Sequence, residues 1–164
     1  MAVRQISTGQ TFADSTRHMP YGKYKFVVEI DGFKRAGFNK VTGLDKKTGV
    51  RKYRDGGDNS TYHKGPGITE YSAITLERGM SEDADFLNWS EEISNLDGNL
   101  ENDGRGGFRR NLSIVLQDHA GNEVKRWNIY EAFATEYSFD DLDAHSEDNL
   151  IERIVIEHEG WELA

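Results

Sequence analysis

Apolar and polar residues alternate in several stretches of this chain, and this alternation limits the chain to a fold rich in β-strands. In residues 23–30, Phe26, Val28 and Ile30 occupy every second position. The same two-residue period returns at residues 110–117 and 150–159, and residues 70–78, 124–130 and 133–139 also have the composition of strands. Because successive side chains of a strand point to opposite faces, each run predicts a strand with one buried face.

One segment has helical spacing instead. Ser81 offers a side chain that caps free backbone N–H groups, and acidic residues follow it, as suits the positive end of a helix dipole. The predicted helix covers about residues 81–96, and its apolar residues recur every three or four positions: Phe86, Trp89, Ile93 and Leu96. We expect this stripe to pack on the core. The predicted fold class is therefore mainly β, with two packed antiparallel sheets forming a β-sandwich or barrel and one flanking α-helix.

A long segment between the early strands has little to bury. Residues 43–67 are charged and interrupted by glycines. Loops of this length in compact domains are usually functional or disordered. We therefore expect a projecting loop, with residues 50–53 and 60–63 as the arms of a hairpin. Residues 1–22 are expected to form a flexible N-terminal arm, and residues 23–164 a single domain.

Charge is divided unevenly along the chain. The net charge is -9. Residues 1–60 carry 12 Lys and Arg against 6 Asp and Glu, whereas residues 61–164 carry 8 against 23. The division has two interpretations. It is either an ordinary solvated surface on which the signs happen to segregate, or a self-complementary surface in which the basic part of one copy meets the acidic part of another.

Composition and motifs argue against catalysis. Without cysteine the chain has no disulfides, no thiolate metal cluster and no cysteine nucleophile. The five histidines show no zinc or di-iron spacing, and no phosphate-binding glycine loop is present. We expect no enzyme activity, no cofactor and no bound metal. The chain also lacks an apolar start and a run of about 18 apolar residues, so we expect synthesis in a cytoplasm and no membrane anchoring.

Two binding motifs are weaker alternatives. Six residues stand at the calcium-ligand positions of an EF-hand-like loop: Asp141, Asp143, His145, Glu147, Asn149 and Glu152. Five of them carry a side-chain oxygen, and His145 is a poor calcium ligand. The sixth position holds Ser146 instead of glycine, and the segment lies between strands, which favours an acidic loop. Basic residues also alternate with aromatic ones around Tyr53 and Tyr62, a pattern found in nucleic-acid binders, but the overall field is negative.

Several short runs, in this order and spacing, resemble a known family. They are FVVEIDGF (26–33), GFNKVTGL (37–44), YRDGG (53–57), GPG (65–67), ITLERG (74–79), DFLNW (85–89) and IEHEG (156–160). Together they resemble the tail tube proteins of contractile phages and related injection systems. The resemblance covers about residues 22–162. It also implies a fold similar to that of the tube protein of type VI secretion.

The resemblance implies a structural protein. It implies homo-hexameric rings that stack head to tail into a rigid hollow tube, inside a contractile sheath and between baseplate or hub and tube-terminator proteins. DNA or effector cargo would pass through the lumen without specific binding, in a virion tail or an injection particle. The alternative is a monomeric β-sandwich binding or adaptor module.

In that family the long loop reaches the adjacent ring. The resemblance therefore places residues 44–64 at the stacking contact, where most of the basic excess lies. The contact residues predicted on this basis are Lys46, Lys47, Arg51, Lys52, Arg54, Asp55 and Lys64.

Overall fold

The structure is a computed structural model that describes residues 20–23, 25–31, 37–57, 60–94 and 107–164. Within these residues the chain forms nine strands and one helix. In order they are β1 (Phe26–Ile30), β2 (Lys40–Thr42), β3 (Lys46–Tyr53), β4 (His63–Tyr71), β5 (Ile74–Gly79), α1 (Asp85–Ser94), β6 (Arg110–Gln117), β7 (Glu123–Phe139), β8 (Ile151–Glu157) and β9 (Gly160–Leu163). The mainly β prediction with a single flanking helix is confirmed.

The strands pair antiparallel in the order β1-β6-β7-β8-β5-β2, and β9 pairs with β7. The first half of β7 pairs with β6 and the second half with β8, so one long strand joins two sheet halves. Strands β1 and β2 stand at the two ends of the order and do not pair with each other in the described part of the chain. The sheet is therefore open, and the closed barrel that the sequence left as an alternative is wrong.

Strand β7 replaces two predicted strands. Residues 124–130 and 133–139 were expected to be two separate strands, and in the structure they are one. The chain instead bends at Glu131, whose φ of 52° is left-handed, and the backbone N–H of Glu131 donates to the side-chain oxygen of Asn111 at 3.0 Å. This side-chain hydrogen bond supports an irregular strand where the sequence predicts a break.

One apolar core fills the space between the two sheet halves and the helix. Its fully buried side chains come from β1, β5, β6, both halves of β7, β8 and α1, and the largest are Trp89, Phe86, Ile74, Leu76, Ile129, Ile154 and Ile156. Ile93 packs partly buried against this core. The indole N–H of Trp89 donates to the carbonyl of Phe108 at 2.8 Å, which satisfies a buried polar group. Leu96 lies outside the described residues.

Helix α1 begins at Asp85, later than the predicted start at Ser81. The side chain of Asp83 accepts a hydrogen bond from the backbone N–H of Asp85 at 3.0 Å. The side chain of Ser81 accepts one from the N–H of Asp83 at 3.4 Å. Residues 81–84 are therefore used in capping turns, and Asp83 takes the role expected of Ser81.

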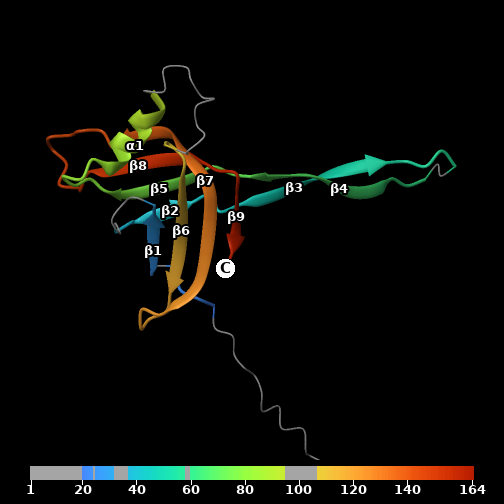
Figure 1. The fold of residues 1–164 in the computed structure, drawn as a ribbon, viewed down its shortest axis with the longest axis horizontal. Helices are drawn as coiled ribbons and strands as arrows, with labels where there is room; N and C mark the ends of the chain where they lie inside the picture. Colours follow the sequence, from blue (N-terminus) through green and yellow to red (C-terminus); the bar gives the residue numbers. More distant parts are fainter. Residues whose placement is uncertain (1–19, 24, 32–36, 58–59, 95–106) are drawn as a thin grey trace, which may run out of the picture.

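Residues 43–67, expected as a loop, are mostly part of a two-stranded ribbon. Strands β3 and β4 pair over seven positions and form a separate sheet. Figure 1 shows this β3–β4 ribbon (residues 46–71) extending far from the rest of the domain. The hairpin arms predicted at residues 50–53 and 60–63 were too short, and the strand predicted at residues 70–78 is divided between β4 and β5.

The ribbon leaves the domain through a close contact of two backbones. Gly43 has a φ of +93°, and a Cβ atom there would stand 2.0 Å from the carbonyl oxygen of Ala73. Ala73 lies in the short link between β4 and β5. Glycine is therefore required where the chain turns into β3.

Candidate assembly surface

The β3–β4 ribbon is exposed along nearly its whole length. Every residue of β3 is exposed, and most of β4 is too. The hydroxyls of Thr48 and Thr69 lie 2.9 Å apart across the strands, and the rings of Tyr53 and His63 stack at 5.5 Å near the tip. Two isolated strands are at best marginally stable in water, because they bury little apolar surface. The ribbon therefore has the construction of a segment that gains stability from a partner.

A groove runs along one face of the ribbon. Its volume is about 390 Å³, and its lining residues are Lys47, Gly49, Val50, Arg51, Gly67, Ile68 and Glu70. A Cβ atom on Gly67 would stand 3.0 Å from the carbonyl oxygen of Gly49, so the backbones of these two lining residues approach closely. The register shifts between Thr48 and Val50, which places a β-bulge at this point.

All seven predicted contact residues lie on the ribbon or in its turn, and all are exposed. Lys46, Lys47, Arg51 and Lys52 are on β3, Lys64 is on β4, and Arg54 and Asp55 follow β3. Lys52 and Lys64 stand directly opposite each other in the register. Like charges in such a pair destabilise a ribbon and favour an anionic neighbour.

Aromatic side chains fix the base of the ribbon to the domain. The ring of Tyr71, at the end of β4, lies 5.8 Å from the ring of His158 and 6.0 Å from that of Trp161. The ring nitrogen Nε2 of His158 lies 3.0 Å from the carbonyl oxygen of Ser72. His158 directly follows β8 and Trp161 lies in β9. These contacts therefore hold the ribbon in one direction relative to the sheet.

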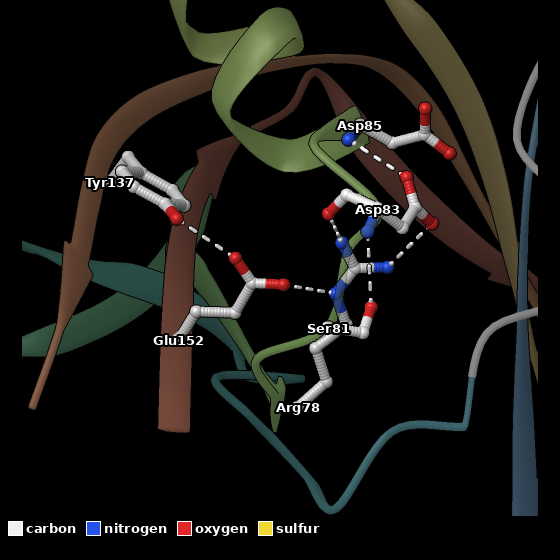
Figure 2. A network of polar contacts seen from close by, with 6 residues as sticks. All are labelled: Arg78, Ser81, Asp83, Asp85, Tyr137 and Glu152. Atoms are coloured by element: carbon white, nitrogen blue, oxygen red, sulfur yellow. Dashed lines mark hydrogen bonds and ion pairs between the residues drawn. The ribbon is translucent and has the colours of Figure 1, made fainter. Parts of the chain in front are cut away.

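A buried polar network ties β5, β8 and the start of the helix together (Figure 2). The guanidinium of Arg78 forms an ion pair with the carboxylate of Glu152. It also contacts the Asp83 carboxylate at 3.4 Å and the Asp83 carbonyl at 3.2 Å, and it lies 4.0 Å from the centre of the Phe86 ring. The Tyr137 hydroxyl donates to the second oxygen of Glu152 at 2.8 Å. Both charges of the pair are therefore hydrogen-bonded, as burial requires.

The environment of the network shifts two pKa values. Burial, followed by the hydrogen bond to Glu152, raises the pKa of Tyr137 to about 12. The hydrogen bond from the backbone N–H of Asp85 holds the pKa of Asp83 below its usual value. Tyr137 thus remains a neutral donor. Sequence reasoning missed this network, although Glu152 on the same strand face as Ile154 and Ile156 was a signal that a buried carboxylate needs a partner.

An acidic loop of residues 140–150 connects β7 to β8. Residues 141–149 are all exposed, and Leu142 is 78% exposed. The Asp140 carboxylate pairs with Arg153 at 2.6 Å, and the Asp143 carboxylate accepts the N–H of His145 at 2.9 Å. These contacts shape the loop from within.

The position of Glu152 argues against a calcium site in this loop. Glu152, the twelfth residue of the EF-hand-like pattern, is buried and paired with Arg78. Across the residues that the structure describes, no group of three or more His, Asp or Glu side chains is arranged to hold a metal ion.

The ribbon and the acidic loop lie at opposite ends of the domain. Strand β5 starts at Ile74, after a link of two residues from the end of the ribbon, and its last residue, Gly79, pairs with Ile151 next to the acidic loop. The second half of β7 runs the same way and enters the loop after Phe139. Figure 1 shows the ribbon at one end of the long axis and the loop between β7 and β8 at the other. The chain therefore presents different surfaces in two opposite directions.

The strands at the two ends of the sheet order also have open edges. Within the described part of the chain, β1 pairs with β6 alone and β2 with β5 alone. Unpaired edge strands offer N–H and carbonyl groups to another chain. Open edges, an exposed ribbon and two different ends define a class of protein, a β-rich structural protein with several surfaces open to other chains.

Comparison with known proteins identifies the family. Residues 22–162 match the family model described as T4-like virus tail tube protein gp19, and the chain belongs to that family. It is a tail tube protein of the kind found in contractile injection systems. No curated protein sequence matches it. Within the described residues, no helix has the length and apolar character of a membrane span.

Solved structures of injection particles are similar to this chain. A chain in the sheath-tube complex of the PVC extracellular contractile injection system in its extended state has 26% identity and a TM-score of 0.74, covering 93% of this chain and 99% of that one. A chain in the tube-terminating cap of the anti-feeding prophage has 25% identity and a TM-score of 0.78, covering 95% and 98%. Hcp1 from Flavobacterium johnsoniae shares the fold at 16% identity, with a TM-score of 0.50 and coverage of 85% and 94%.

Proposed function

We propose that this protein is the repeating subunit of a rigid hollow tube, made of six-membered rings stacked head to tail. Its role is structural, without catalysis or cofactor. It is made in a cytoplasm and assembled in a phage tail or injection particle, where a contractile sheath surrounds the tube. Baseplate or hub proteins and a terminator meet its ends, and DNA or effector cargo passes through the lumen without specific binding.

The β3–β4 ribbon is the single observation that carries this proposal. It extends from the domain, is exposed throughout β3, and pairs with no other strand in the described residues. In a subunit that acted alone, the ribbon would stay exposed to water, where a two-stranded sheet is only marginally stable. A subunit in a stack would cover it against the adjacent ring.

Lateral joining within a ring is assigned to the open sheet edges. Strands β1 and β2 are at opposite ends of the strand order. When the β1 edge of one copy pairs with the β2 edge of its neighbour, the contact joins two different surfaces. Such a heterologous contact closes into a ring when the rotation between neighbours fits. Backbone pairing of this kind continues the sheet from one subunit to the next.

Axial stacking is assigned to the ribbon and its basic side chains. The seven contact residues, Lys46, Lys47, Arg51, Lys52, Arg54, Asp55 and Lys64, carry six positive charges and one negative charge. Each exposed ion pair contributes only about 0–1 kcal/mol, so the joint depends on its repetition around the ring. The acidic majority of the rest of the chain supplies complementary charge.

Electron microscopy of the purified protein tests the proposal, together with light scattering over a range of concentrations. We expect rings and hollow tubes, and a scattering mass that grows in multiples of the ring. Particles that stay monomeric at every concentration, with sheath and baseplate proteins also present, would instead support a monomeric binding or adaptor module.

A further inference from the structure

The groove of the ribbon is lined by both apolar and charged side chains. Val50 is 62% exposed and Ile68 is 73% exposed, and both line the groove next to Gly49 and Gly67. Lys47 and Arg51 contribute positive charge to its lining, and Glu70, which stands opposite Lys47, contributes one negative charge, so the lining is positive on balance. Both apolar side chains remain mostly exposed in the single chain, so the groove suits an apolar side chain flanked by negative charge that can approach Lys47 and Arg51.

The acidic loop presents that combination. Leu142 is the most exposed of the large hydrophobic residues in the described chain, at 78%. Asp141 and Asp143 stand on either side of it. An exposed leucine in a loop of acidic residues is complementary in charge and in polarity to the groove.

The two surfaces are placed for contact between copies in a line. They lie at opposite ends of the domain, joined by the length of β5 and β8. A contact between two different surfaces on opposite ends is heterologous, and repetition of it produces a stack. A two-fold dimer would bring the same surface of both partners together, and the net positive charge of the groove, from Lys47 and Arg51 against Glu70, opposes this.

From these observations we propose that the acidic loop of one subunit docks in the groove of the β3–β4 ribbon of a subunit in the adjacent ring. Leu142 enters between Val50 and Ile68, and the carboxylate of Asp141 lies next to Arg51 or Lys47. This inference rests on the proposed tube function and names the partner surface of the ribbon.

The absence of cysteine from the natural chain makes crosslinking a direct test. A variant with Leu142→Cys and Ile68→Cys is assembled into tubes and oxidised. We expect a ladder of disulfide-linked oligomers on a non-reducing gel, which disappears with reductant. Leu142→Cys with Thr69→Cys is the matched control, because Thr69 is exposed but contacts Thr48 and does not line the groove.

A charge exchange provides a second readout. Arg51→Glu alone and Asp141→Lys alone should each lower the yield of tubes at low salt, and the combined variant should restore it. One exposed pair changes an equilibrium constant by at most about fivefold, but every subunit of a ring repeats the contact, so the loss should exceed that value. If the cysteine pair at 142 and 68 prevents assembly, Leu142→Cys with Val50→Cys replaces it.

The outcomes separate the two proposals. A natural chain that forms neither rings nor tubes overturns the tube function and this contact with it. Tubes in which the 142–68 and 142–50 pairs do not crosslink, or in which the 142–69 control crosslinks equally well, overturn the contact and leave the tube function standing. Tubes whose yield falls with each single charge change and stays low in the combined variant also overturn it.

Discussion

The side chains of Arg78 and Glu152 form a buried ion pair that joins β5 to β8, and these side chains are only 5% and 3% exposed. The same guanidinium reaches Asp83 just before the helix, so a single side chain links two strands to the flanking helix. The pair lies at the end of the sheet that faces away from the ribbon, next to the acidic loop. It therefore fixes the surface that, in our proposal, meets the next ring.

Removal of one partner of this pair should be strongly destabilising. Arg78→Met leaves the Glu152 carboxylate buried without its cation, and we expect the free energy of unfolding to fall by about 3–5 kcal/mol. Chemical denaturation of the unassembled subunit measures this. The control is Arg153→Met, whose contacts with Glu77 and Asp140 are partly solvated and should contribute about 1 kcal/mol or less. Equal losses in the two variants would contradict the structural role of the buried pair.

Alkaline pH should weaken the fold through Tyr137. The pKa of Tyr137 is raised from about 10 in the unfolded chain to about 12 in the folded one. Between these values the unfolded chain loses the phenol proton while the folded chain keeps it, so stability is complete below pH 10 and falls as the pH rises to 12. The loss should be of the order of 2 kcal/mol.

The variant Tyr137→Phe isolates this effect. It cannot ionise at this position, but it leaves one oxygen of Glu152 without its donor, so it should be less stable by about 1–3 kcal/mol at neutral pH. Its stability should then fall less steeply than that of the natural chain between pH 10 and 12. Parallel curves for the two proteins would show that Tyr137 does not titrate as described.

Gly43→Ala should impair folding at the point where the ribbon leaves the domain. The left-handed φ costs an alanine about 1–2 kcal/mol, and the new Cβ atom would overlap the carbonyl oxygen of Ala73. We expect a loss of at least about 2 kcal/mol in thermal or chemical unfolding. Gly56→Ala and Gly57→Ala are the controls, since a Cβ atom at either position meets nothing within 4 Å, and they should change stability by under about 0.5 kcal/mol.

Reversal of the ribbon charges should separate folding from stacking. With Lys46, Lys47, Arg51 and Lys52 all changed to Glu, the circular dichroism spectrum should stay the same, because these residues are exposed on β3 and do not contribute to the core. Tubes should become shorter, and the natural tubes should also shorten as salt is added. Electron micrographs at several salt concentrations measure tube length. A control with Lys23→Glu and Lys125→Glu alters exposed charges outside the ribbon, and unchanged tube length in the ribbon variant would refute electrostatic stacking.

The alternation of apolar and polar residues predicted a strand well where one face of the strand is buried and the other is more exposed. In β8 the alternation of Glu152, Ile154 and Ile156 with partly exposed neighbours appears in the structure as expected. It failed at Glu131, where the backbone N–H donates a hydrogen bond to the side chain of Asn111, 20 positions away, and supports a bend inside one strand. It also failed for the ribbon, whose strands carry no buried face and so no period that distinguishes a strand from a loop.

The sequence by itself determined the β-rich class, the helix that carries Phe86 and Trp89, the basic segment and the resemblance to tail tube proteins. These properties follow from spacing and composition over short windows, where the geometry of a strand or a helix is set locally. The tertiary structure decided that Arg78 meets Glu152, 74 residues away, and that the basic ribbon and the acidic loop lie at opposite ends of the domain. Such relationships depend on which strands pair and in which direction, and that choice is made by packing around the shared core.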